Sequence, residues 1–75
     1  MGVEDHIKEK LSFVSFCIEE YKTFKGMNGM AVSALFDKSG VFDYLTEHYD
    51  ILHSFSREAI LSDIQRFIDE RRSNQ

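Results

Sequence analysis

The sequence predicts an all-α protein, built as a compact array of about four short helices with short connections. Apolar residues recur at helical spacing in several segments, whereas no alternating strand pattern of useful length occurs. The chain has no proline, and glycines at positions 26, 29 and 40 separate the helical segments. With 75 residues the chain is too short to need a second core, so residues 1–75 are expected to form a single helical domain.

The first predicted helix covers about residues 4–25 and carries a stripe of apolar side chains. The stripe is formed by Ile7, Leu11, Val14, Ile18 and Tyr21. These positions fall within about 80° of the helix circumference, which predicts a buried face. Phe13, Cys17 and Phe24 lie beside the stripe and widen the apolar arc to about 160°. Because a surface helix typically buries about 100°, this helix is expected at the centre of the fold.

The second and third predicted helices meet at a glycine. The second covers about residues 29–38, with Asn28 as its N-cap, and Ser39 and Gly40 end it. The third begins directly afterwards and repeats apolar side chains on one face. That face holds Val41, Leu45, His48, Tyr49 and Leu52. On this face His48 is expected to be a buried, structural histidine that donates to a carbonyl group.

The last predicted helix follows a turn between residues 50 and 56, and either Ser54 or Ser56 is expected to cap it. Its apolar side chains fall within about 120° of arc and predict a buried face. They are Ile60, Leu61, Ile64, Phe67 and Ile68. Asp63 lies outside that arc, together with other charged residues.

Charge and hydropathy limit the classes of function. The formal net charge is -4, whereas proteins that bind nucleic acids usually carry a basic excess, so nucleic acid is not expected as the principal ligand. No apolar run approaches the roughly 20 residues that span a bilayer, and the charges in residues 1–10 do not fit a signal peptide. We therefore expect a cytoplasmic protein without membrane contact.

Residues suited to catalysis or metal binding do not form a recognisable motif. Cys17 is the only cysteine, which excludes an internal disulfide and a cysteine-rich zinc site, and it is expected to be a small buried hydrophobe. His48 and His53 are five residues apart, whereas two helical metal ligands usually stand four apart. We predict no catalytic residue, no metal, no cofactor and no small-molecule ligand. A metal-dependent or thiol enzyme is the least favoured alternative.

A DNA-binding regulator of the helix-turn-helix type is the main alternative function. The predicted helices on either side of Gly40 are short and joined through that glycine, as in a helix-turn-helix. The second of them carries Asp43, Glu47 and Asp50 and no lysine or arginine. These acids would repel the phosphates of DNA, so the charges argue against this alternative.

Apolar surface that four short helices cannot cover favours a role in protein interaction. Phe16 lies nearly opposite the buried stripe of the first helix, and Tyr44 lies off the main stripe of the third. A single exposed aromatic residue is also ordinary, and a further packing contact explains Phe16 equally well. Because so small a chain gains little net stability from its core, dimerisation or binding to another protein would supply the missing stabilisation.

An ordered set of residues resembles a known family. The set comprises Leu35-Phe36-x-Lys38-x-Gly40-Val41-x-Asp43-Tyr44-Leu45, followed by Glu47-x-Tyr49-Asp50-x-Leu52-His53. Upstream stands Phe16-Cys17-Ile18-Glu19, and downstream stands Asp63-Ile64-x-x-Phe67-Ile68. With this set, from about residue 7 to residue 68, the chain resembles the DUF3791 type, a small bacterial family of unknown function.

The resemblance implies a short stand-alone helical protein of anaerobic or gut bacteria, without a catalytic motif. Some members are encoded beside ADP-ribosyltransferase-like proteins, which implies an antitoxin-like or accessory partner of a neighbouring gene product. The positions at which the resemblance implies a partner contact are Phe16, Glu19, Asp43, Tyr44, His53 and Asp63. Asp43 equally suits the first turn of its helix, where a carboxylate favours the positive helix end. We therefore expect a non-enzymatic interaction module that self-associates or binds a protein encoded nearby.

Overall fold

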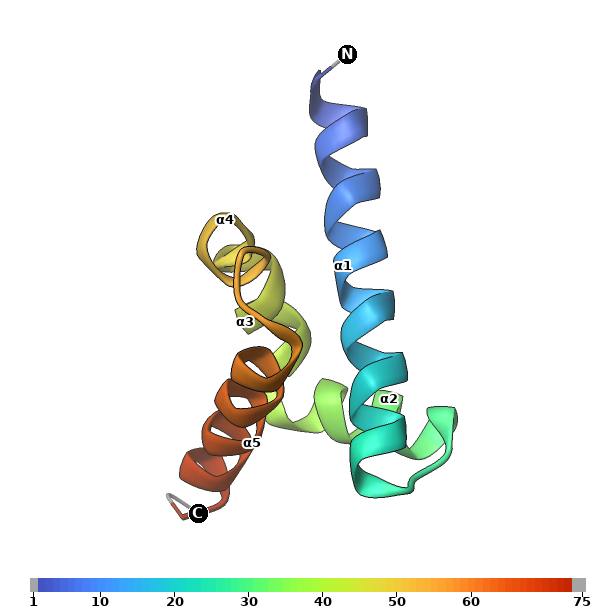
Figure 1. Ribbon diagram of the computed structural model, residues 1–75, viewed down its shortest axis with the longest axis vertical. Coiled ribbons are helices and arrows are strands. Elements are labelled where there is room, and N and C mark those ends of the chain that lie inside the picture. The colour runs from blue at the N-terminus through green and yellow to red at the C-terminus, as the bar shows by residue number, and fades with distance from the viewer. Residues whose placement is uncertain (1, 74–75) are drawn as a thin grey trace.

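Five helices account for most of the chain in the computed structural model, which describes residues 2–73 and the side chains of residues 7–72. They are α1 (Gly2–Lys25), α2 (Gly29–Ser39), α3 (Val41–Glu47), α4 (Tyr49–Leu52) and α5 (Arg57–Ser73). No strand occurs between residues 2 and 73, which confirms the predicted all-α fold class. Figure 1 shows α1 on one side, α3 to α5 on the other, and α2 crossing between them at one end.

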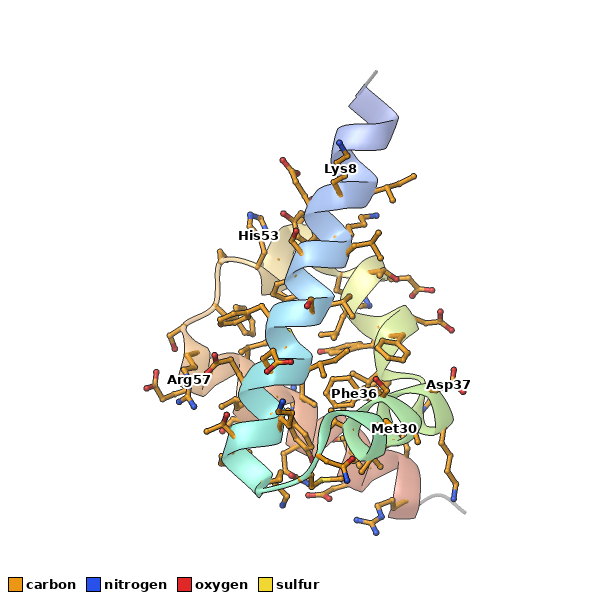
Figure 2. The ribbon with its side chains drawn as sticks, turned by 90° about the vertical axis from the view of Figure 1, so that its right-hand side faces the viewer. Lys8, Met30, Phe36, Asp37, His53 and Arg57 are labelled. Carbon is orange, nitrogen blue, oxygen red and sulfur yellow. The ribbon has the colours of Figure 1, made fainter. Side chains whose placement is uncertain are left out.

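The length of α1 sets the shape of the molecule. Its 24 residues rise by about 1.5 Å each, or roughly 36 Å, and the longest extent of the whole molecule is 40 Å. The core contacts with the other helices lie in the C-terminal half of α1. At Phe13, near the middle of the helix, α4 also packs against α1. The N-terminal turns of α1 project beyond the other helices, as both views show (Figures 1 and 2).

The core lies around the C-terminal half of α1. Buried side chains from all five helices form it, and they include Cys17, Phe36, Leu45, Leu52 and Ile64. The Tyr21 ring of α1 packs against the Phe36 ring of α2 with 5.3 Å between ring centroids. The prediction that the first helix is central is thus confirmed for the C-terminal half of α1.

The N-terminal half of the predicted buried stripe is exposed, which contradicts the prediction. Ile7 and Leu11 are 51% and 62% exposed, whereas Val14 and Tyr21 further along the same stripe are 8% and 1% exposed. Phe24, placed on the flank of the stripe, is also exposed. The reason is geometric: periodicity shows which residues share a helix face, but α4, the helix beside this part of α1, lies against the Phe13 face and leaves Ile7 and Leu11 uncovered.

Three of the predicted helix caps are found in the structure. The Asn28 side chain accepts a hydrogen bond from the Ala31 backbone N–H at 2.8 Å, as an N-cap does. Gly40 ends α2 in the left-handed conformation. Of the two candidate serines, Ser56 caps α5, because its Oγ accepts from the Ala59 N–H at 3.2 Å. Ser54 Oγ instead donates to the Ile51 carbonyl at 2.8 Å.

The third predicted helix is interrupted at His48. The backbone of this residue leaves helical geometry, with φ of -109° and ψ of 24°, and a second short helix begins at Tyr49. At this break His48 is exposed, whereas Leu52 in the following turn is buried. The prediction of a buried, structural His48 is therefore wrong. Its ring packs against Tyr44 with centroids 5.2 Å apart.

Replacing Gly40 with alanine is expected to lower the free energy of unfolding by about 2 kcal/mol, more than the same change at Gly26. Both residues have positive φ, +80° and +65°. A Cβ on Gly40 would also lie 2.8 Å from an Arg71 guanidinium nitrogen, whereas Gly26 has open space around it. Urea denaturation of Gly40→Ala and Gly26→Ala measures the difference. Equal losses would show that Arg71 gives way freely.

Candidate functional site

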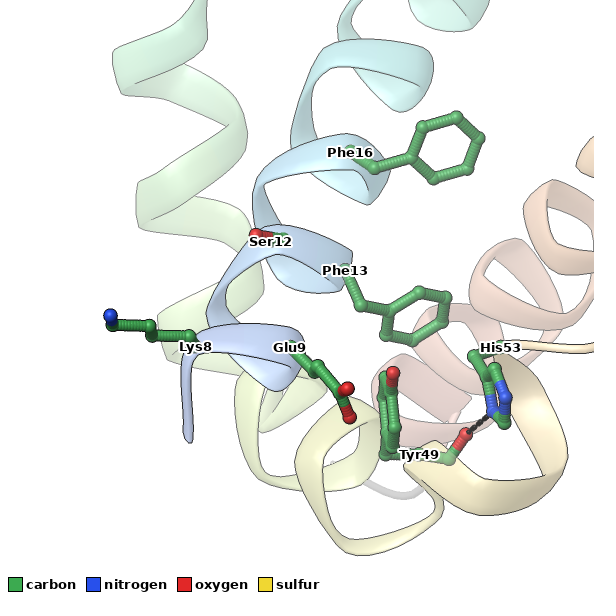
Figure 3. Close-up of a pocket in the computed structure, with 7 residues that line it drawn as sticks. All are labelled: Lys8, Glu9, Ser12, Phe13, Phe16, Tyr49 and His53. Atoms are coloured by element: carbon green, nitrogen blue, oxygen red, sulfur yellow. Dashed lines mark hydrogen bonds between the residues drawn. The ribbon is translucent and has the colours of Figure 1, made fainter. Parts of the chain in front are cut away.

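A groove between the N-terminal half of α1 and α4 is the candidate functional site (Figure 3). Its volume is about 420 Å³. The lining residues are Lys8, Glu9, Ser12, Phe13, Phe16, Tyr49 and His53. Two of the six predicted partner-contact residues, Phe16 and His53, thus come together in one groove although 37 positions separate them in the chain.

Aromatic rings form the floor and one wall of the groove. Phe13 of α1 meets Tyr49 of α4 edge to face, with ring centroids 5.5 Å apart. The Tyr49 ring stacks on the His53 imidazole at 4.5 Å, with 11° between the planes. These distances are typical of favourable ring pairs. The groove therefore presents an almost continuous aromatic surface that runs from α1 to the end of α4.

The orientation of His53 is fixed by a backbone contact. Its Nδ1 lies 2.7 Å from the Tyr49 carbonyl oxygen (Figure 3). Because a carbonyl oxygen only accepts, Nδ1 carries the hydrogen and donates it, which leaves Nε2 of the neutral ring as an acceptor. The side chain is exposed at the edge of the groove. His53 therefore offers a polar group beside the aromatic floor.

Phe16 supplies the most accessible apolar surface of the groove. Its side chain is 45% exposed, and in Figure 3 it projects from α1 on the same side as Phe13. Lys8 and Glu9 stand toward the other end of the groove. The prediction that Phe16 lies outside the core is confirmed. An aromatic centre with a charged edge is the composition that protein interfaces favour.

Tyr44 and Asp63 also come together, but inside the fold. The Tyr44 hydroxyl donates to Asp63 Oδ2 at 2.5 Å, and Arg66 pairs with the other carboxylate oxygen. Asp63 is only 9% exposed, so the sequence-based placement of this residue outside the buried arc is wrong. Tyr44 of α3 reaches Asp63 because α3 packs against α5. The pair joins α3 to α5.

Burial and charge both act on Tyr44. Burial, then the hydrogen bond to Asp63 and the negative charge of Asp63, raise the pKa of Tyr44 to about 12. The ring stacks on Phe67 with centroids 4.3 Å apart and 18° between the planes. Tyr44 is therefore neutral at physiological pH and acts as a hydrogen-bond donor that holds two helices together.

Asp43 and Glu19 lie away from the groove. Asp43 stands in the first turn of α3, as predicted, and lines a second hollow of about 340 Å³ with Tyr44, His48 and Arg71 among others. Glu19 is exposed on α1 and forms an ion pair with Lys22 at 3.3 Å. The six predicted positions are thus divided among the groove, the α3–α5 joint and two separate surfaces.

Two aromatic residues of the groove were assigned to the core by sequence reasoning. Phe13 and Tyr49 lie on apolar helix faces, and each is half-buried. Their meeting depends on how α4 sits against α1, and the four-residue α4 exists only because the chain breaks at His48. The signal available in the sequence was the spacing of Phe13 and Phe16, which places two rings on neighbouring positions of α1.

Cys17 behaves as the sequence predicts. Its side chain is fully buried in the core, and burial raises the pKa of its thiol to about 12. A protonated, inaccessible thiol is a poor nucleophile. Among the described side chains, no group of three or more histidine, cysteine, aspartate or glutamate residues is arranged to hold a metal ion.

The helix pair around Gly40 has the outline of the predicted helix-turn-helix alternative. α2 and α3 are joined directly through Gly40, but α3 has only seven residues. Asp43 and Glu47 are exposed on it, where a DNA backbone would meet like charge. None of the helices within residues 2–73 combines the length and hydropathy needed to cross a membrane.

The pKa shift of Cys17 predicts a loss of stability in alkali. Its pKa is 9.0 in an ordinary setting and about 12 in the fold, so above pH 9 the unfolded chain releases a proton that the folded chain retains. The free energy of unfolding should then fall by about 1.4 kcal/mol per pH unit, and more steeply above pH 10 as Tyr44 contributes. Urea denaturation at pH 8 to 11 measures this. The Cys17→Ala variant should decline clearly less between pH 9 and 10, because Tyr21 and Tyr44, whose ordinary pKa is 10.0, contribute little in this range.

The Tyr44 hydroxyl is expected to contribute more to stability than the Tyr21 hydroxyl. Tyr44 donates to a buried carboxylate, whereas Tyr21 donates to the neutral Gln65 side chain at 3.0 Å. Hydrogen bonds to charged groups contribute about 1.5–3 kcal/mol, against about 1 kcal/mol for neutral ones. Denaturation of Tyr44→Phe and Tyr21→Phe compares them. A Tyr44→Phe loss no larger than the Tyr21→Phe loss would show that Arg66 alone satisfies Asp63.

The family comparison gives a clear result. A family model described as a protein of unknown function (DUF3791) matches residues 12–71. A search of the curated proteins and a search of the solved structures both end without a significant match. The matched range includes α2 to α4 and most of α1 and α5, and with them Phe13, Phe16, Tyr49 and His53 of the groove. The chain therefore belongs to the DUF3791 family of proteins of unknown function.

Proposed function

We propose that this chain is a non-enzymatic protein-interaction module of the cytoplasm that binds an apolar segment of a protein partner in the α1–α4 groove. The observation that carries this proposal is the accessible aromatic surface formed by Phe13, Phe16, Tyr49 and His53. Aromatic residues are enriched at the centres of protein interfaces, and a polar edge such as Lys8 and Glu9 surrounds them there.

The energetics of Phe16 support this use of the groove. Burying a whole phenylalanine side chain stabilises a complex by about 1.5–3 kcal/mol, so the part of Phe16 still exposed represents about 1 kcal/mol. Neighbouring rings are already ordered by their mutual contacts. A partner that covers Phe16 therefore gains apolar contact without the entropic cost of ordering a flexible wall.

The choice of partner follows from the family. The resemblance described above implies an antitoxin-like or accessory role beside a neighbouring gene product, and this product is the first partner to test. A second copy of this chain, forming a dimer, is the other form of the proposal. Both would use the same groove, and a covalent capture experiment separates them by the mass of the captured protein.

Photo-crosslinking from Phe16 is expected to capture the partner. A benzoylphenylalanine at position 16 should form a crosslink to the neighbouring gene product when the two are produced together, because this side chain lies at the groove edge. The matched control carries the same group at Met30, which is 86% exposed but on α2, outside the groove. With purified proteins, Phe16→Ser should weaken binding about fivefold and Met30→Ser should not.

Two results would contradict the proposal. Equal crosslinking from positions 16 and 30 would indicate random contact, and unchanged affinity of Phe16→Ser would remove the groove from the interface. A crosslinked species with twice the mass of the chain would select the dimer, which light scattering of the unmodified protein would then show directly.

A further inference from the structure

The exposed end of the α1 stripe forms a second apolar surface, which adjoins the groove at Lys8 but faces another side of α1. Along α1 the apolar residues alternate at spacings of four and three positions, which is the heptad pattern of helices that pack against other helices. They are Ile7, Leu11, Val14, Ile18 and Tyr21. In the C-terminal half this stripe packs against helices of the same chain, as the contact of Tyr21 with Phe36 of α2 shows.

Toward the N-terminus, the stripe continues for about one heptad beyond the residues that other helices of this chain cover. Val14 and Tyr21 are 8% and 1% exposed, and Ile18 is half-buried against the core. Ile7 and Leu11 are more than half exposed. Lys8, which lies between them in sequence, stands on a turn of α1 that projects past the other helices (Figure 2). A surface whose geometry already fits helices is thus left open at this end.

Two lysines flank the open end of the stripe. Lys8 and Lys10 lie about 80° to either side of the midpoint between Ile7 and Leu11, given 100° per residue. Glu9, the acid between them in sequence, lies on the opposite side of α1, where it lines the groove. Among the described side chains, the charges beside Ile7 and Leu11 are therefore positive on both edges, in a protein whose net charge is -4.

We propose that Ile7 and Leu11 bind an amphipathic α-helix of a partner protein that carries acidic residues on both sides of its apolar stripe. Flanking positions of paired helices determine which partners associate, because opposite charges attract there and like charges repel. A second copy of α1 fits poorly, since Lys8 and Lys10 of the two copies would face one another in either orientation. This contact is additional to the groove and does not depend on it.

The test uses two synthetic peptides and the full chain. Both peptides have leucine heptad stripes, and they differ only in flanking residues, all glutamate in one and all lysine in the other. Each peptide repels its own copies, so it is available to bind α1. Fluorescence anisotropy at low salt should show at least about tenfold tighter binding of the glutamate peptide. The double variant Lys8→Glu/Lys10→Glu should reverse this preference.

Two further variants define the site. Leu11→Ser should abolish binding of the glutamate peptide, and circular dichroism should show unchanged helix content because Leu11 is exposed. Phe16→Ser should leave peptide binding unchanged, so a failure here is distinguishable from a failure of the groove proposal. If Leu11→Ser lowers the helix content, the test rests on Lys8→Glu/Lys10→Glu alone, since this variant retains Ile7 and Leu11.

Several outcomes would overturn this inference. Equal affinity for the two peptides, or a preference that persists in Lys8→Glu/Lys10→Glu, would show that the lysines do not select the partner. Binding that survives Leu11→Ser in a folded protein would place the peptide elsewhere. A dimer of the unmodified chain that Leu11→Ser dissociates, as seen by light scattering, would identify a second copy as the occupant.

Discussion

The length of α1 is the constraint on which the rest of the structure depends. This helix is roughly 36 Å long, and the remaining helices can cover only part of it. The buried contacts lie in the C-terminal half of α1, where Cys17 is buried and Tyr21 contacts α2 and α5. α1 is thereby left with exposed apolar side chains on two faces, Leu11 on one and Phe16 on the other.

Local signals in the sequence predict the helices well, because caps and periodicity act over a few residues. Asn28, Gly40 and Ser56 end or begin helices as their side chains dictate, and Cys17 is buried as its helix face indicates. Such local signals could not predict that Ile7 is exposed. An apolar stripe indicates which residues of a helix can pack against another helix. It does not indicate whether that helix belongs to the same chain.

The candidate site shows the same division between local and distant information. Phe16 was identified because its position on the helix is incompatible with the buried face, which is a local property. Asp63 was misplaced because its burial depends on Tyr44, nineteen positions earlier. The break at His48, which turns Tyr49 toward Phe13, also has no simple local cause such as proline or glycine. Contacts between helices decide these features, and helix periodicity does not contain them.

The α3–α5 joint and the groove are connected through α4. A helix of four residues has no stability of its own, so α4 is held by its neighbours. Leu52 anchors it in the core, and α3, which precedes it directly, is fixed to α5 by the bond from Tyr44 to Asp63. The buried polar pair therefore supports the wall of the groove that Tyr49 and His53 form. In this way Tyr44 and Asp63, two polar residues of the family pattern, act structurally.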